Sequence, residues 1–431
     1  MRLSLKNIGM IETADIGIDG ITVIAGENNS GKSTVSKALF SVFNCFYQID
    51  RKIASERLDI VGRIISSTYH DANGRTTRLF DMDEIADEII KNKDKYINDA
   101  NLLQSDITSM LMQADEYFEK YIGKANIAGA SEKIIQVFNV SDDEILITIM
   151  QKRIQSEFSD QIVNMNNLNK NGEVILQIKD DETKISISLK EDVNVDLFGM
   201  FNLNTEAIYI DDPFVVDNAR LMTRYRVQYA EHREHLASKL IRGTFNAFEG
   251  NSIPRSPIDH ILTSKKLEYV FDKLNTVCSG EFVRKNRSIA YKENKSGNVF
   301  DMTNISTGLK TFVIIKALLL NGSIEENGTI ILDEPESHLH PEWQLVFAEL
   351  IVLLQKEFNL HILINTHSPY FVNALEVYSH KHGISLRCKY YLVDIINRSS
   401  TIFDVSSNIE RIYEKLARPL QDLENMRYSN D

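Results

Sequence analysis

The segment that most constrains the fold is Gly26–Ser33, which reads Gly-Glu-Asn-Asn-Ser-Gly-Lys-Ser and matches the pattern G-x-x-x-x-G-K-[ST]. It follows the wholly apolar stretch Ile21–Ala25, which predicts a buried strand, and leads into Ser33–Tyr47, where apolar residues recur at helical spacing. A Gly-rich loop between a strand and a helix presents backbone N–H groups and a helix N-terminus, and both surround phosphate oxygens. The context therefore predicts a phosphate-binding loop in an α/β fold.

Side chains in such a loop have defined roles toward a nucleotide. The Lys32 ammonium would reach the β- and γ-phosphates, and the Ser33 hydroxyl would ligate Mg²⁺. The residues predicted to hold the nucleotide are Asn28, Asn29, Ser30, Gly31, Lys32, Ser33 and Thr34. The segment is thus interpreted as a nucleotide–Mg²⁺ site rather than as a plain turn.

Two further apolar stretches end in residues that suit the same chemistry. Thr329–Leu332 is followed by Asp333, which can hold the hydration shell of the metal, and by Glu334, which can orient or deprotonate an attacking water. His367 follows the next predicted strand, Leu360–Ile364, at the edge where ligands gather in open α/β sheets, and is predicted to contact the γ-phosphate. With Asp333 as metal ligand and Glu334 and His367 as catalytic residues, we expect hydrolysis rather than binding alone.

A second turn of small residues, around Ser306, Thr307 and Gly308, begins another predicted helix and offers a second binding site for phosphate. Two phosphate-binding sites in one chain are explained if a second copy places its turn over the nucleotide of the first copy. ATP would then be sandwiched in a head-to-tail pair. The alternative is a plain helix N-cap formed by Ser306 or Thr307. The spacing alone leaves both interpretations open.

The order of predicted elements indicates the fold class. From Gly308 to Leu375 helices and strands alternate strictly, which predicts a parallel sheet. Helical patterns such as Asp83–Asn101 and Asp142–Phe158, the second opened by a capping box at Ser141 and Glu144, fill much of the first half. We predict five parts: a discontinuous ATPase head at 1–48 and 280–410, a helical insertion at 49–170, a β-hairpin and strand of the same lobe at 171–215, a locally basic helical arm at 216–279, and a C-terminal helix and tail at 411–431.

The charge balance limits the partners of the chain. Its 48 Lys and Arg against 61 Asp and Glu give a net charge of −13, so no global positive field steers it onto nucleic acid or anionic lipid. Residues 220–242 form a local exception, which is either a solvated helix face or a surface for DNA or a protein partner. The cations of this segment are Arg220, Arg224, Arg226, Arg233, Lys239 and Arg242.

Cysteine usage and hydropathy indicate the compartment. Cys45, Cys278 and Cys388 are far apart, odd in number and without metal-ligand spacing, so neither a disulfide framework nor a zinc cluster is predicted. No apolar stretch reaches the roughly 18 residues of a membrane span, and the N-terminus lacks the apolar core of a secretory signal. We expect a cytoplasmic protein without a membrane segment.

Taken together, these motifs resemble the ABC-type ATPases of the SMC, RecF and OLD (overcoming lysogenization defect) group, and within it the OLD-like "AAA family" ATPases of bacterial anti-phage defence modules. The segments that carry the resemblance are Gly26–Ser33, Ser306–Gly308, Ile330–Pro335, Asn365–Pro369 and the phrase Asp333–Gln344. It covers roughly residues 1–48 and 300–378. The fold that it implies is an α/β ABC-type P-loop ATPase head with a mixed sheet and a parallel core, plus large, mainly helical insertions.

The resemblance also implies ATP and Mg²⁺ as ligands and a role for each matching residue. Lys32 and Ser33 would be P-loop ligands, Asp333 the Mg²⁺ ligand, Glu334 the catalytic base and His367 the switch histidine. Ser306 and Gly308 would contact the γ-phosphate bound by a partner copy, and Ser337–Pro341 would be the D-loop at the dimer seam. The Q-loop glutamine stays open among Gln48, Gln151, Gln155, Gln161 and Gln177.

Functionally, the resemblance implies a dimer, or a higher oligomer, that acts as sensor or regulator of a separately encoded effector, a nuclease or another toxin. Full OLD enzymes carry a nuclease domain with an Asp-x-Asp motif, whereas only 53 residues follow Tyr378 here and none of them form that motif. We therefore expect no nuclease in this chain. The alternative function is a DNA-repair or DNA-binding ATPase of RecF or SMC type; a P-loop kinase or GTPase would explain neither Ser306–Lys310 nor His367.

Overall fold

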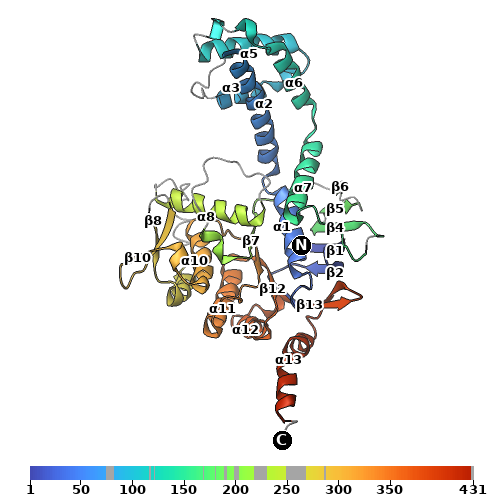
Figure 1. The fold of residues 1–431 in the computed structure, drawn as a ribbon, viewed down its shortest axis with the longest axis vertical. Helices are drawn as coiled ribbons and strands as arrows, with labels where there is room; N and C mark the ends of the chain where they lie inside the picture. The colour runs from blue at the N-terminus through green and yellow to red at the C-terminus, as the bar shows by residue number, and fades with distance from the viewer. Residues whose placement is uncertain are drawn as a thin grey trace. The chain divides into compact units, whose positions relative to one another are not determined.

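The computed structural model describes residues 1–73, 82–115, 118–120, 122–167, 169–179, 181–188, 192–198, 203–217, 231–248, 268–285 and 288–428. The chain divides into two compact units (Figure 1). The first, here called the head unit, consists of Met1–Tyr47 and Met150–Asp431. The second, the helical unit, consists of Gln48–Ile149. The predicted insertion at 49–170 overlaps the helical unit, which ends at Ile149, inside a helix that continues into the head unit.

The helical unit consists of helices around a small apolar core. Its elements are α2 (Ile49–Asn73), α3 (Met82–Lys91), α4 (Lys93–Tyr96), α5 (Ala100–Ala114), η1 (Phe118–Lys120), η2 (Ile122–Lys124), α6 (Ile127–Asn139) and the start of α7 (Asp142–Phe158). Side chains from different helices, among them Ile65, Leu103, Phe118 and Ile134, are buried together. Within this unit, α2 packs against α3 and α6, as Figure 1 shows.

One helix prediction in this unit is wrong and one is confirmed. The single helix predicted over Asp83–Asn101 is divided among α3, α4 and α5. The Asp99 carboxylate accepts the backbone N–H groups of Asn101 and Leu102 and so starts α5. The predicted capping box is present, since Ser141 and Glu144 exchange backbone and side-chain hydrogen bonds at the start of α7.

The head unit is organised by a sheet of eleven strands in the described residues. Its strands are β1 (Arg2–Ile8), β2 (Ile11–Gly17), β3 (Ile21–Ala25), β4 (Gly172–Ile178), β5 (Asp181–Ile187), β6 (Val193–Phe198), β7 (Ala207–Ile210), β11 (Thr329–Asp333), β12 (His361–Thr366), β13 (Cys388–Ile396) and β14 (Ser399–Asp404). Their order is β6-β5-β4-β1-β2-β14-β13-β3-β12-β11-β7. The run β13-β3-β12-β11-β7 is parallel, whereas β1, β2, β4, β5 and β6 pair antiparallel with one another. β14 joins the two halves, because it pairs antiparallel with β13 and parallel with β2. The predicted α/β fold with a mixed sheet and a parallel core is confirmed.

Helices pack against this parallel core and exclude water from it. They are α1 (Lys32–Phe46), α8 (His232–Phe248), α10 (Thr307–Leu320), α11 (Pro341–Phe358), α12 (Pro369–Lys381), α13 (Glu410–Tyr428) and a helix at 268–277, with short turns η3 (Pro213–Val216), η4 (Met302–Asn304) and η5 (Ser385–Arg387). Phe312 of α10 and Phe347 of α11 are fully buried with Ile21 and Val23 of β3 in one apolar cluster. These contacts hold the loop that follows β3 against a rigid support.

Two strands were not expected from the sequence. β6 extends the antiparallel edge, and β8 (Glu281–Lys285) joins β9 (Ser288–Lys292) and β10 (Val299–Asp301) in a separate three-stranded sheet. β8 is short and reads Glu-Phe-Val-Arg-Lys, so it shows little of the alternation that predicts a strand. Its pairing partner is β9, in antiparallel register from Glu281 opposite Lys292 to Lys285 opposite Ser288.

The basic segment at 220–242 is only partly described. Arg220, Arg224 and Arg226 lie outside the described residues. Arg233 of α8 pairs with Asp211 at 2.6 Å, and Lys239 pairs with Glu206. These two cations are therefore neutralised within the fold. In the described part of the chain, no helix has the length and apolar character needed to cross a membrane.

Candidate nucleotide-binding site

The parallel core brings the predicted site residues to one edge of the sheet. Because β3, β12, β11 and β7 run parallel, their carboxyl ends lie at the same edge. The Gly26–Ser33 loop follows β3, Asp333 ends β11 and His367 follows β12. Segments separated by more than 300 residues in the sequence thus meet, and backbone hydrogen bonds tie them together: Gly26 N–H donates to the Thr366 carbonyl and Glu334 N–H to the Asn365 carbonyl.

Two glycines determine the backbone conformation of the loop and its close contacts with neighbouring strands. Gly31, the N-cap of α1, has φ 87°, and a Cβ at this position would lie 2.9 Å from Cδ1 of Ile11. Gly26 lies against β13, where a Cβ would come within 2.9 Å of Cβ of Val393. Neither position accepts a larger residue without displacement of its neighbour, and Gly31 also needs the left-handed backbone conformation. The loop therefore curves tightly over the N-terminus of α1.

Lys32 is held over the loop rather than in solvent. Its side chain is 4 % exposed, and its ammonium donates to the backbone carbonyls of Gly26 at 3.0 Å and Glu27 at 2.7 Å. The same nitrogen lies 3.5 Å from Oε1 of Glu334. A buried cation at the mouth of the loop supplies the positive charge that phosphate groups require.

Asp333 is fixed by two donors that the sequence analysis did not single out. The Tyr209 hydroxyl, at β7, donates to Oδ2 of Asp333 at 2.8 Å, and the Asn365 amide, in β12, donates to Oδ1 at 3.0 Å. The Asn365 amide also donates to the Ser36 hydroxyl on α1 at 2.8 Å. Burial, with the nearby Asp333 charge, raises the pKa of Tyr209 well above its usual value, so this phenol stays a donor. Each carboxylate oxygen keeps a lone pair for a further partner.

Glu334 is turned toward Lys32 and His367 by its backbone. Its φ is 46°, a conformation that costs a non-glycine residue about 1 kcal/mol and is found where the fold holds it in place. Oε1 of Glu334 lies 3.3 Å from Nδ1 of His367 and 3.5 Å from Nζ of Lys32. The carboxylate is therefore placed between the lysine of the loop and the histidine of the next strand end.

Glu336 holds the segment that carries His367 through hydrogen bonds, and the sequence analysis did not assign it a role. Its side chain is 3 % exposed, and its carboxylate accepts hydrogen bonds from the Thr366 hydroxyl and, at 3.3 Å, from the His367 backbone N–H. Burial raises the pKa of Glu336. By joining the segment after β11 to the segment after β12, Glu336 sets the position of His367 relative to Glu334.

Two hollows flank the loop. The larger, of about 540 Å³, is lined by Asn28, Asn29, Ser33, Asp333 and Glu334 together with residues of β7, η3 and α10. The smaller, of about 420 Å³, is lined by Asn29, Ser30, Gly31, Lys32, Ser33, Thr34, Lys37 and Glu334, among others. Both volumes are typical of sites for small ligands. All seven predicted loop residues thus line one hollow or the other.

The donor set of the larger hollow suits Mg²⁺. The Ser33 hydroxyl and the Asp333 carboxylate both line it, and this ion prefers oxygen ligands. Across the described residues, no group of three or more His, Cys, Asp and Glu side chains is placed to hold a metal.

Asp211 and Asp212 are site residues that the sequence analysis missed. They follow β7, whose register pairs Ile210 with Leu332 of β11, and they line the larger hollow beside Asp333. They lie more than 120 residues from Asp333 in the sequence, so only strand pairing brings them together. Of the five candidate Q-loop glutamines, Gln161 alone is among the described residues that line the two hollows.

A buried ion-pair network continues from this wall into the protein. His232 lies 2.5 Å from a carboxylate oxygen of Glu157 and 3.1 Å from Oδ2 of Asp211, and its ring stacks on Tyr209 with centroids 4.1 Å apart. Burial lowers the pKa of His232, but the ion pairs of its ring nitrogens with the Asp211 and Glu157 carboxylates outweigh burial and raise it to about 9. A protonated imidazole therefore joins α7, through Glu157, to the wall of the hollow.

Ser306, Thr307 and Gly308 line neither hollow of their own chain. Ser306 is exposed and caps α10, since its hydroxyl accepts the Leu309 N–H at 3.4 Å. Gly308 lies close to the segment after β11, where a Cβ would come within 2.8 Å of the His338 carbonyl. The N-cap interpretation is confirmed for Ser306, and contact with a partner copy's nucleotide stays a prediction.

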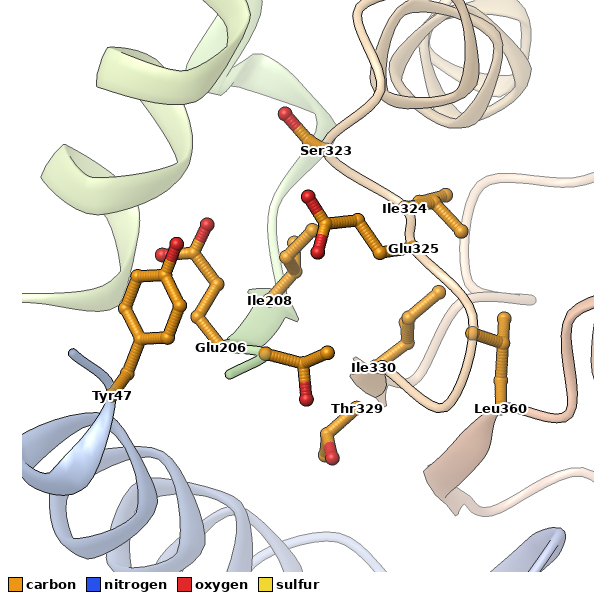
Figure 2. Close-up of a pocket in the computed structure, with 11 residues that line it drawn as sticks. Tyr47, Glu206, Ile208, Ser323, Ile324, Glu325, Thr329, Ile330 and Leu360 are labelled. Atoms are coloured by element: carbon orange, nitrogen blue, oxygen red, sulfur yellow. The ribbon is translucent and has the colours of Figure 1, made fainter. Parts of the chain in front are cut away.

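A hollow at the opposite edge of the sheet is too small for a substrate. Figure 2 shows it between Tyr47, Glu206 and Thr329, at the amino-terminal ends of β7 and β11. Its volume of about 10 Å³ is near the minimum for one water molecule. The two hollows at the carboxyl edge are both larger than this one.

The fold and this edge define the class: an α/β P-loop ATPase, with the loop after β3 and an acidic pair after β11 of the same parallel core. The chain belongs to the AAA ATPase domain family, whose model matches residues 1–372. The expected resemblance to the "AAA family" ATPases is thereby confirmed.

Known proteins similar to the chain fall into two groups. A curated relative, the Retron Vc95 probable ATPase of Vibrio cholerae serotype O1 biovar El Tor, is 31 % identical over 86 residues. That match covers 17 % of this chain and 16 % of the relative, so the chain spans about a sixth of the relative's length. Among solved structures, an SMC head domain from Thermotoga maritima is 10 % identical, covers 94 % of this chain and 98 % of that chain, and has a TM-score of 0.39. An Smc head domain with an extended coiled coil, bound to the C-terminal domain of ScpA derived from Pyrococcus furiosus, is 13 % identical with coverages of 99 % and 98 % and a TM-score of 0.42.

Proposed function

We propose that this protein is an ATP-binding and ATP-hydrolysing ABC-type ATPase that works as a dimer and regulates a separately encoded effector, a nuclease or another toxin, in bacterial anti-phage defence. The observation that carries the hydrolytic part is the position of Glu334. Its carboxylate lies 3.5 Å from the loop lysine Lys32 and 3.3 Å from His367. Glu334 follows β11, and β12, which precedes His367, lies between β11 and the strand β3 that precedes the loop.

Loop residues and two oxygen donors would hold the substrate. Asn28–Thr34 would surround the phosphates of ATP with backbone N–H groups and the Lys32 ammonium. Ser33 and Asp333 would hold Mg²⁺, which neutralises charge on the phosphates when bound. Tyr209 and Asn365 keep Asp333 in one orientation, so little rearrangement would be needed on binding.

Hydrolysis would then use the two residues at the strand ends. Glu334 orients a water molecule and accepts its proton while the water oxygen bonds to the γ-phosphorus. The bond between the γ-phosphorus and the bridging oxygen breaks, and ADP leaves with that electron pair. His367 contacts the γ-phosphate, and Glu336 holds His367 in position through its backbone N–H.

The position of the second small-residue turn supports the proposed dimer. Ser306 is exposed, and the turn lines neither hollow of its own chain. In a head-to-tail pair, Ser306, Thr307 and Gly308 would instead contact the γ-phosphate bound by the partner copy. Ser337 and His338, the start of the predicted D-loop, line the larger hollow and would lie at the seam.

The similarity to the retron ATPase over 86 residues supports the defence context. The second function that we predicted, a DNA-repair or DNA-binding ATPase, depends on the basic segment at 220–242. Two of its described cations, Arg233 and Lys239, are neutralised by Asp211 and Glu206. We therefore favour the regulatory function.

Phosphate release and particle mass test the proposal together. Glu334→Gln should lower phosphate release at least 100-fold while ATP remains bound, and light scattering should show a dimer in ATP. Lys32→Ala should lose ATP binding and stay monomeric. Wild-type turnover in Glu334→Gln would contradict the base assignment. The effector is tested by co-purification with the products of neighbouring genes and by plating phage on cells that carry wild type or Glu334→Gln; equal plating would contradict the defence role.

A further inference from the structure

The helical unit contains a hollow of its own, of about 420 Å³, which shares no lining residue with the two hollows of the ATP site. Helices α2 and α6 and the residues just before α6 form its wall. Ile60, Ile64 and Ala130 supply an apolar floor. Arg63, Lys124 and Lys133 supply three cations around it. The volume falls in the range of sites for small ligands.

The charge of this hollow is of one sign. All three cations are exposed, and none of the described residues that line the hollow is a carboxylate. Within the described chain, Arg63, Lys124 and Lys133 form no ion pair, whereas Arg57, on the same helix as Arg63, pairs with Asp142 at 2.6 Å. Three unpaired like charges around one concave surface raise the free energy of the empty site and favour an anion in it.

The start of α6 adds to the same field. Asn126 and Gly129 line the hollow, and Asn126 caps α6 by accepting the Gly129 N–H at 3.0 Å. The N-terminus of a thirteen-residue helix carries partial positive charge. One hollow with apolar side chains in its wall thus receives cations from α2, η2 and α6 and the N-terminus of α6. The chain as a whole has a net charge of −13.

We propose that this hollow binds a phosphate-bearing ligand of nucleotide size, either a free nucleotide or one nucleotide of a nucleic-acid strand. Arg63 offers the planar guanidinium that matches phosphate oxygens, and Lys124 and Lys133 add point charges. Ile60, Ile64 and Ala130 would contact the base or sugar. This site lies outside the proposed ATPase mechanism, so either proposal can fail without the other.

The test uses the full chain with Lys32→Ala, so that nucleotide bound at the P-loop does not contribute. Binding of a fluorescent single-stranded 10-mer, as DNA and as RNA, and of a fluorescent mononucleotide is measured by anisotropy at several salt concentrations. The hollow variant R63Q/K124Q/K133Q is compared with K91Q/K93Q/K95Q, which removes the same charge from exposed lysines of the same unit outside the hollow.

The hollow variant should lose at least tenfold in affinity. For the strand, the slope of log K against log salt should become less steep by roughly 0.7 for each phosphate that the hollow contacts. The control should change affinity less than twofold. Loss confined to the 10-mer identifies a nucleic-acid strand, and loss confined to the mononucleotide identifies a free nucleotide. Equal loss in both variants, or no binding of any probe, overturns the proposal.

A second measurement needs no variant of the hollow. Acetylation of surface lysines followed by mass spectrometry should show that the bound probe protects Lys124 and Lys133 at least fivefold. Lys91, Lys93 and Lys95 should react at the same rate with and without it. Uniform protection, or none, also overturns the site.

Discussion

The Tyr209 hydroxyl donates a 2.8 Å hydrogen bond to Oδ2 of Asp333, and this contact joins the strand at the edge of the parallel core to the predicted metal ligand. The two residues lie 124 positions apart in the sequence. β7 and β11 are paired in parallel register, so the phenol is carried to the carboxylate by the sheet itself.

Removal of this hydroxyl should weaken Mg²⁺ binding. Tyr209→Phe deletes one hydrogen bond to a charged group, so we expect a loss of about 1–2 kcal/mol in stability and roughly a tenfold higher Mg²⁺ concentration for half-maximal phosphate release. The control is Tyr413→Phe, which deletes a similar bond, 2.7 Å long, to Glu376 outside the site. It should lose stability without a change in Mg²⁺ dependence; equal Mg²⁺ titrations for the two variants would contradict the role of Tyr209.

The exposed turn at Ser306 should be needed for pairing but not for binding by one chain. Ser306→Arg places a bulky cation at the proposed seam, so Glu334→Gln carrying it should bind ATP normally and stay monomeric in light scattering. Ser109→Arg, at an exposed serine of the helical unit, is the matched control and should still pair. A dimer of unchanged stability in the Ser306 variant would rule out the sandwich.

His232 should make stability depend on pH. Its pKa rises from 6.5 to about 9 on folding, so its contribution is fully present below pH 6.5 and is lost as the pH rises through about 9. We expect His232→Gln to be less stable than wild type by up to about 3 kcal/mol at pH 6, with the gap closing by pH 10. Urea unfolding of both proteins at several pH values measures this gap. His380→Gln, at an exposed position, should show no such trend, and a gap that is constant with pH would contradict the prediction.

Gly31 should tolerate no side chain. Gly31→Ala combines φ 87° with a Cβ 2.9 Å from Ile11, so we expect a loss of about 1–3 kcal/mol and of ATP binding, measured by thermal unfolding and calorimetry. Gly123→Ala is the control, because a Cβ there meets nothing within 4 Å. Retention of ATP affinity in Gly31→Ala would show that the loop has room to move.

Local patterns predicted the strand–loop–helix order around Gly26–Ser33 and the strands that end at Asp333 and before His367. Each depends on residues that are neighbours in the sequence, so periodicity and turn chemistry reveal it. The N-cap at Ser306 was readable for the same reason, since a hydroxyl caps the backbone only a few residues away. The break within Asp83–Asn101 was missed, because helical spacing of apolar residues continues across the Asp99 cap.

Contacts between distant segments could not be predicted in this way. Asp211 and Asp212 end a four-residue strand, and nothing near them in the sequence tells that β7 pairs with β11. Glu336 stands among other acids and histidines, and only its burial against Thr366 and His367 shows its role. Arg63, Lys124 and Lys133, the three cations of the hollow in the helical unit, are spread over 70 residues, so a charge count over a short window does not find them.

The sequence by itself determined the phosphate-binding loop, the acidic pair after a buried strand and the α/β class, because each follows from local backbone preferences and apolar periodicity. Tertiary structure alone decided which side chains surround Asp333 and Glu334, and which cations share a surface in the helical unit. The physical reason is that strand register and helix packing are set by burial of the whole apolar core, to which residues far apart in the chain contribute together.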